Sequence, residues 1–228
     1  MSDEAIEVEL PGARVAFSTR LGGVSEGSFA SLNLGILTED DGDHVHANRE
    51  HLAQVLGIAE VAMGHQVHGT DLATWDAPST ELIDVDGHVT DRPGLALLVL
   101  TADCLPVALA APGRVAMLHC GWRGVAGGII ANGVRAFDDP PVAVVGPGIG
   151  QAHFEVGPEV LEAFADVPGA ADGRMLDLRA VAEARLRATG VQDVRHVEHC
   201  TFERDDLFFS HRRDGGVTGR QAGLAWLT

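Results

Sequence analysis

Cysteine is scarce in this chain of 228 residues: it occurs only at positions 104, 120 and 200, and no two cysteines form a CxxC pair. An odd count without paired spacing excludes a disulfide framework and favours a reducing compartment. Long apolar runs are also lacking, since the longest covers residues 95–100 and is far too short to cross a bilayer. The N-terminal stretch MSDEAIEVELPG has no apolar core of the signal-peptide type. We therefore expect a soluble, cytoplasmic protein.

Basic residues are few as well. The chain has 16 Lys and Arg against 33 Asp and Glu, a formal net charge of −17. Proteins that bind nucleic acid or anionic membranes usually present a basic face, so we expect neither partner. A phosphate group can still bind locally, because backbone N–H groups and a few arginines suffice to hold it.

The apolar patterns predict a single domain, residues 1–228, that mixes helices and strands. Predicted strands cover residues 13–18, 61–67, 72–75, 95–100, 105–110, 115–118, 142–145, 194–197 and 224–227. Predicted helices cover residues 43–56, 125–137, 158–165 and 176–189. Asp43 is the expected N-cap of the first helix, and Gly57 ends it. The strands at 61–67 and 72–75 are expected to form a hairpin, and the polar stretch 79–94 a loop.

Three residues with metal-ligating side chains follow predicted strands. Cys104 and His119 each come shortly after an apolar run, and His68 lies in a similar context in the segment GHQVHGTD. A thiolate and two imidazoles are a ligand set that Zn²⁺ accepts readily, and three protein ligands leave an open fourth position, as catalytic zinc sites do. We interpret His68, Cys104 and His119 as converging on one metal ion. The alternative is that they do not meet, because their spacing is not that of a short metal-binding motif.

Other candidate ligands are interpreted differently. Cys120 would point to the opposite face of a strand from His119, so we expect it to fill the core. His44 and His46 form an HxH pair on a predicted helix, where residues two apart lie on different faces, so a joint copper site is not expected there. A multicopper oxidase would need several such pairs, and this chain has one.

Several segments carry a family resemblance: STRLGGVSEGSFASLNLG, QVHGTD, TADCLPV, HCGWRG, GPGIG and FFSHRRDGGVTGR. Through them the chain resembles the YfiH family, whose members have been described as laccase-domain or polyphenol-oxidase proteins and as purine nucleoside phosphorylases. The resemblance implies a layered α/β sandwich with mixed β-sheets, and a metal bound by His68, Cys104 and His119. It implies zinc-dependent cleavage of adenosine, inosine or methylthioadenosine by phosphate, and it allows deamination of adenosine. The oxidase naming leaves copper as an alternative metal.

The chain departs from the usual family pattern at two places. Cys120 stands where the family commonly has alanine, and Gln151-Ala152-His153 follow GPGIG where it commonly has cysteine. The first change exchanges one small residue for another. The second could alter the pocket wall, and with it the substrate preference.

The residues that would bind a nucleoside and phosphate are hypotheses. Arg20, Arg49 and Arg123 are candidates for holding phosphate, although for each one the role of a surface or structural arginine is the simpler interpretation. Asn33 could bind the sugar or the base, or could belong to an ordinary turn.

Proton transfer and the class of reaction also have alternatives. Asp103, or Asp86 in its place, could move a proton during deamination, whereas Asp103 could instead cap a turn or orient a ligand. A cysteine hydrolase would use Cys104 as nucleophile and His119 as base, acting on an amide or a peptidoglycan precursor. A polyphenol oxidase and a non-enzymatic binding module have less support, and the sequence does not fix the oligomeric state.

Overall fold

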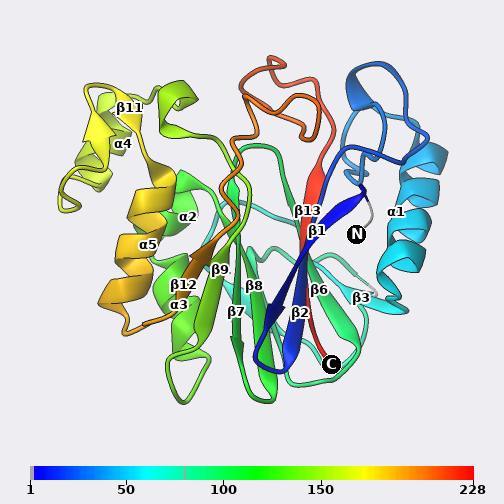
Figure 1. The fold of residues 1–228 in the computed structure, drawn as a ribbon, viewed down its shortest axis with the longest axis horizontal. Coiled ribbons are helices and arrows are strands. Elements are labelled where there is room, and N and C mark those ends of the chain that lie inside the picture. The colour runs from blue at the N-terminus through cyan, green and yellow to red at the C-terminus, as the bar shows by residue number, and fades with distance from the viewer. Residues whose placement is uncertain (1–2, 80) are drawn as a thin grey trace.

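All the strands except β10 (Ala171–Asp172) and β11 (Met175–Leu176), which pair with each other, form two mixed sheets that pack face to face (Figure 1). The structure is a computed structural model, which describes residues 3–79 and 81–228. The first sheet has the order β1-β2-β13-β6-β3, with β1 Ala5–Leu10, β2 Ala13–Ser18, β3 Glu60–Ala62, β6 Leu95–Thr101 and β13 Gln221–Leu227. The second has the order β12-β9-β7-β8-β5-β4, with β4 Leu72–Thr74, β5 Gly87–Thr90, β7 Leu105–Ala111, β8 Arg114–Cys120, β9 Val142–Val145 and β12 Val194–His196.

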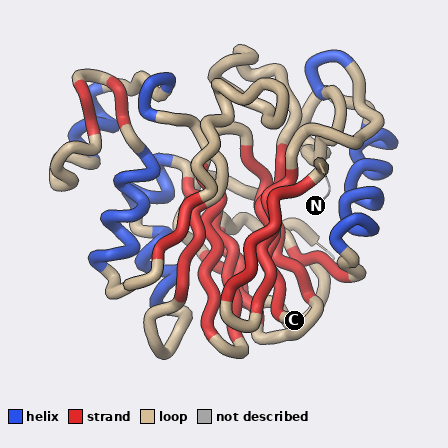
Figure 2. The backbone as a smooth tube through the Cα atoms, in the orientation of Figure 1, coloured by secondary structure: helices blue, strands red, loops and turns tan. Residues whose placement is uncertain are grey.

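Helices cover the outer face of each sheet, as Figure 2 shows. Helix α1, Gly42–Leu56, packs on the first sheet. On the second sheet lie α2 Trp122–Gly127, α3 Ile129–Arg135, α4 Pro158–Ala163 and α5 Leu178–Ala188. Short elements complete the chain: η1 Gly27–Phe29, η2 Gln151–His153, β10 Ala171–Asp172 and β11 Met175–Leu176. The layers therefore run helix, sheet, sheet, helix, which confirms the layered α/β sandwich with mixed sheets.

The strands β7 and β8 are buried on both faces, which explains their nearly continuous apolar sequence. In β7, Val107 and Leu109 face the helices, whereas Ala108 and Ala110 face the first sheet. Small inner side chains leave room for larger ones from the first sheet, such as Phe17. In the described ranges, no helix combines the length and apolar character needed to cross a membrane.

The predicted hairpin between residues 61–67 and 72–75 is wrong. The first strand, β3, ends at Ala62 and pairs with β6 in the first sheet, whereas β4 pairs with β5 in the second. Residues 63–71 therefore carry the chain from one sheet to the other. This crossing brings His68 beside both sheets.

Three further local predictions need correction. The stretch 79–94 is not all loop, because the buried strand β5 lies within it. The helix at 125–137 is two helices, separated at Gly128, whose φ of 101° is incompatible with a continuous helix. The N-cap of α1 is Asp41, whose carboxylate accepts the backbone N–H of Asp43. Gly57 ends α1 in the left-handed conformation, as expected.

Candidate metal centre

His68, Cys104 and His119 come together from three separate segments. Their ligand atoms all lie within 4.8 Å of one another. His68 Nε2 is 3.9 Å from Cys104 Sγ, and the two imidazole rings meet edge to face with centroids 4.8 Å apart. The structure thus brings the three predicted ligand residues into one cluster.

The packing of the two sheets places these side chains. Cys104 lies in the turn where the chain leaves β6 in the first sheet and enters β7 in the second. His119 is near the end of β8, where it pairs with Pro106 of β7. His68 lies on the crossing segment between β3 and β4 and has a positive φ of 60°. The turn between the sheets, a strand of the second sheet and the crossing loop each supply a ligand, so the site depends on how the sheets pack.

Asp86, which immediately precedes β5, ties two of the ligand residues together. Its carboxylate accepts backbone N–H groups of Val67 at 3.0 Å, His68 at 3.0 Å and Gly69 at 2.7 Å. Its Oδ1 also lies 2.7 Å from His119 Nδ1. With Nδ1 bonded to the carboxylate, Nε2 is the His119 nitrogen available to a metal. Asp86 is fully buried, which makes it a positioning residue and leaves it poorly placed to move a proton to substrate.

The charges in the cluster favour a thiolate. Burial alone would raise the pKa of Cys104, but the charge of His119 and contacts with both imidazoles outweigh it and lower the pKa to about 6. Burial alone would lower the pKa of His119, but the Cys104 thiolate and the bond to Asp86 raise it to about 9. Both shifts favour a thiolate–imidazolium pair when no metal is bound. A cation that displaces the His119 proton would find a thiolate and two imidazoles.

The glycines of the HCGWRG segment are needed for this packing. A Cβ on Gly121 would lie 2.8 Å from His68 Cδ2 and 3.1 Å from Cys104 Sγ. A Cβ on Gly124, within α2, would lie 2.9 Å from the carbonyl oxygen of Gly69. Only residues without a side chain let the His68 loop approach β8 and α2 this closely.

The cluster lines a cavity of about 570 Å³, a size typical of small-molecule sites. Apolar side chains form much of the wall: Ile36, Leu37, Met63, Leu82, Leu100, Trp122, Ile149, Phe154 and Leu178. Four arginines also line it: Arg49, Arg123, Arg212 and Arg220. Among the described lining residues Asp103 is the only acidic one, so this cavity is locally cationic in a strongly acidic chain.

The four arginines differ in how many of their side-chain N–H groups are already hydrogen-bonded. Arg49 donates Nε and one Nη to the carbonyl of Leu34, and Arg220 donates to two carbonyls of its own loop. Arg212 donates to the carbonyls of His153 and Glu155. Arg123 is exposed and stacks on Trp122, with its guanidinium carbon 4.4 Å from the ring centroid. Within residues 3–79 and 81–228, Arg123 has no hydrogen-bond or ion-pair partner.

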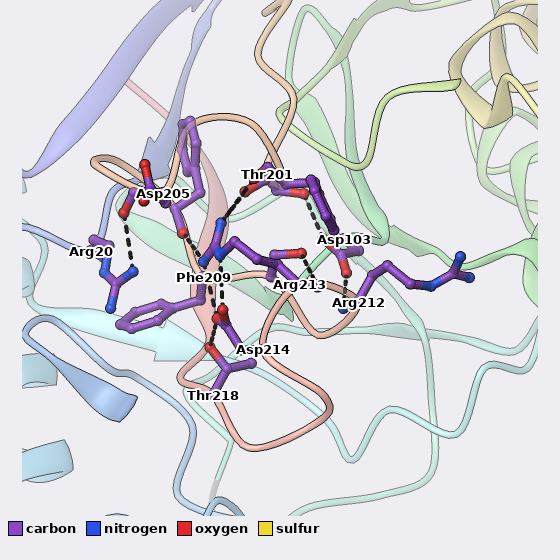
Figure 3. Close-up of polar contacts among 12 residues, drawn as sticks. Arg20, Asp103, Thr201, Asp205, Phe209, Arg212, Arg213, Asp214 and Thr218 are labelled. Atoms are coloured by element: carbon purple, nitrogen blue, oxygen red, sulfur yellow. Dashed lines mark hydrogen bonds and ion pairs between the residues drawn. The ribbon is translucent and has the colours of Figure 1, made fainter. Parts of the chain in front are cut away.

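Arg20 and Asn33 lie outside the cavity wall. Arg20 donates to the carbonyls of Ala30 at 2.7 Å and Asp205 at 3.1 Å, and it covers the Phe209 ring (Figure 3). Asn33 is fully buried, and its amide joins the backbone of Gly35 and Arg220 to polar side chains of its own loop. Both residues hold loops in place, and their contact with substrate stays a prediction.

Asp103 lines the cavity, but its carboxylate is already engaged. One oxygen accepts the hydroxyl of Thr201 at 2.6 Å and the other the backbone N–H of Arg212 at 2.7 Å, as Figure 3 shows. Its φ of 89° lies in the left-handed region. Asp103 thus fixes the turn that carries Cys104 to the loop 199–220.

Sequence reasoning missed Arg212 and Arg220 as cavity residues. Both lie in the segment FFSHRRDGGVTGR, which is dense in arginine for so acidic a chain. That density was the available signal. As expected, Cys120 is fully buried in the core under the helices. His44 and His46 lie on α1.

Known proteins resemble this chain along nearly its whole length. A family model described as multi-copper polyphenol oxidoreductase laccase matches residues 14–228. "Purine nucleoside phosphorylase SCO2081" of Streptomyces coelicolor is 42% identical over 234 residues, covering 95% of this chain and 96% of that protein. "Purine nucleoside phosphorylase YfiH" of Escherichia coli is 37% identical over 230 residues, covering 95% and 94%. The crystal structure of YlmD from Geobacillus stearothermophilus superposes with a TM-score of 0.90 at 33% identity, covering 96% of this chain and 93% of that one.

Proposed function

The chain belongs to the YfiH family, and from this premise we propose that it is a zinc-dependent purine nucleoside phosphorylase. One observation carries the proposal: His68, Cys104 and His119 line the same cavity as four arginines. A metal-ligand cluster beside a cationic wall suits a reaction in which an anion attacks a neutral nucleoside. The names of the relatives in S. coelicolor and E. coli agree with it.

The donor set fits Zn²⁺. The lowered pKa of Cys104 favours the thiolate that zinc requires, and the bond from His119 to Asp86 leaves Nε2 available. Zn²⁺ held there would supply Lewis-acid stabilisation of negative charge. Because the cation has to displace the His119 proton, we expect its affinity to fall as the pH is lowered.

Arg123 is our candidate for binding phosphate. Stacking on Trp122 orients the planar guanidinium, and a fork of free N–H donors matches two phosphate oxygens at once. Arg49 is less free, because two of its N–H groups are bonded to Leu34. We assign to Arg49 the shaping of the wall and to Arg123 the direct contact with the nucleophile.

The apolar wall suits the purine ring. Leu37, Leu82 and Phe154 offer a surface on which a flat base can pack, and the cavity is large enough for a nucleoside and a phosphate. Adenosine, inosine and methylthioadenosine share that base and are the substrates we propose. Deamination of adenosine is a further proposal, in which Asp103 would move the proton after giving up one of its present hydrogen bonds.

The test uses purified protein and adenosine, with and without phosphate. We expect adenine and ribose 1-phosphate, formed at a rate that rises with phosphate concentration. Arg123→Gln should raise the KM for phosphate with little change in the KM for adenosine, whereas the exposed Arg135→Gln on α3 serves as the matched control. Release of free ribose at the same rate without phosphate would show a hydrolase instead.

A second candidate function rests on the thiolate–imidazolium pair. A lowered pKa of Cys104 beside His119 is also the arrangement of a cysteine nucleophile and its base. Such a hydrolase, acting on an amide or a peptidoglycan precursor, would work without metal. A covalent substrate adduct on Cys104 in chelator-treated, active protein would favour it over the phosphorylase.

A further inference from the structure

A second cluster of metal-ligating side chains lies outside the cavity wall. His153, Cys200 and Glu203 place one ligand atom each within 4.8 Å of the others. We propose that these residues bind a second Zn²⁺ ion, held by one thiolate, one imidazole and one carboxylate. None of the three lines the cavity with the first cluster, so the proposal does not depend on the proposed phosphorylase activity.

The backbone holds the two segments of this cluster together. Gly148 forms an isolated parallel bridge with Cys200, in which the N–H of Thr201 donates to the carbonyl of Gly148 at 3.0 Å. The N–H of Gly150 points at Cys200 Sγ, 3.1 Å away. The sulfur is therefore fixed in position before any cation arrives.

The imidazole is oriented as well. The ring of His153 stacks on Phe202, with centroids 4.2 Å apart and planes 11° from parallel. Its Nε2 lies 3.0 Å from a carboxylate oxygen of Glu203. The side chains of His153 and Glu203 are 29% and 58% exposed, which leaves room for solvent as a further ligand. A preoriented ring reduces the entropy lost when the metal binds.

The separations lie close to those of a zinc site, and the ligand charges suit Zn²⁺. In a tetrahedral zinc site, neighbouring ligand atoms are about 3.3–3.6 Å apart, as the usual Zn–S, Zn–N and Zn–O lengths require. The present separations run from 3.0 Å to at most 4.8 Å, so small side-chain rotations would close the site. A thiolate and a carboxylate would balance the charge of Zn²⁺. The adjacent Arg204 does not compete for Glu203, because it is paired with Asp206 at 2.8 Å.

The first test is a titration of the purified full chain with Co²⁺, a spectroscopic substitute for Zn²⁺. We expect a thiolate-to-cobalt absorption band that persists in Cys104→Ser, where the first cluster has lost its thiolate, and that disappears when Cys200→Ser is added to this variant. Glu203→Gln should weaken the second binding event, whereas the exposed and nearby Glu198→Gln should not. If the wild type and Cys200→Ser titrate identically, the proposal is wrong.

A second measurement does not require replacing the cysteine. Alkylation of Cys200, followed by peptide mass spectrometry, should be slowed by added Zn²⁺ in the wild type and should lose that protection in His153→Ala. Thermal unfolding of both proteins checks that the variant is folded. Equal alkylation with and without Zn²⁺ in the wild type would show that Cys200 binds no metal, and that His153 and Glu203 form an ordinary surface ion pair.

Discussion

Asp86→Asn is the most informative single substitution, because one buried carboxylate accepts hydrogen bonds from three backbone N–H groups and contacts His119. An amide has one oxygen, so its NH₂ group must face two of these partners. If the NH₂ faces His119, the imidazole can accept that bond only by moving its proton to Nε2, which then cannot bind a metal. In either orientation at least one backbone N–H stays unpaired.

The expected magnitudes follow from this count. An unpaired buried donor costs about 1–3 kcal/mol, so the free energy of unfolding of the metal-free protein should fall by about that amount. Loss of a group that orients a ligand typically lowers metal affinity by about 10–100-fold, or about 1.4–2.7 kcal/mol. The effect on zinc should therefore exceed what the loss of one exposed charge would cause.

Two assays measure these effects: competition for zinc against a chelator, and urea denaturation of the metal-free protein. Asp76→Asn, an exposed aspartate ten residues earlier, is the control and should change neither quantity appreciably. Wild-type zinc affinity in Asp86→Asn, with unchanged stability, would refute the positioning role of Asp86.

Two further predictions concern acid stability and the close approach at Gly121. Burial lowers the pKa of His88 from 6.5 to about 4. As the pH falls through that range, the unfolded state binds this proton and the folded state does not. The free energy of unfolding should therefore drop by about 3 kcal/mol. Urea midpoints against pH should show a shallower decline in His88→Gln than in the exposed control His46→Gln, and parallel declines would contradict the reasoning. Gly121→Ala should fold but bind less zinc, because its Cβ meets His68 and Cys104. Chelator competition measures this affinity. A wild-type value would show that the site tolerates a methyl group.

The sequence predicted those strands that are buried because their own residues are nearly all apolar. Strands β2, β7, β8 and β9 are apolar runs bounded by turns, and the structure has them close to the expected bounds. Strand β1 was missed, although Ile6, Val8 and Leu10 alternate with glutamates. That alternation was the available signal.

Other features depend on tertiary packing and leave little trace in the sequence. Strand β5 is only GHVT in a polar stretch, and its burial comes from pairing with β8 and β4. The false hairpin arose because short apolar runs on either side of a turn look alike whether they pair with each other or join different sheets.

The candidate site likewise contains residues that the sequence could predict and residues whose role depends on tertiary packing. His68, Cys104 and His119 could be proposed from residue type and resemblance, since both indicate zinc ligands. The positioning role of Asp86 could not, because it needs the loop at 67–69 and strand β8 to converge on one carboxylate. That Arg123, unlike Arg20, has no carbonyl partner among the described residues likewise depends on which carbonyl groups the fold places nearby.

The measurement that tests the central claim most directly is the zinc content and phosphorolytic activity of His68→Ala, compared with the wild type and with His46→Ala as control. A zinc-dependent phosphorylase predicts about one Zn²⁺ per chain at this site in the wild type and control. His68→Ala should lose most of that zinc and nearly all phosphate-dependent turnover of adenosine, while its circular dichroism and thermal unfolding show an intact fold. Full turnover by metal-free His68→Ala would contradict the account, as would several copper ions and no zinc in the wild type.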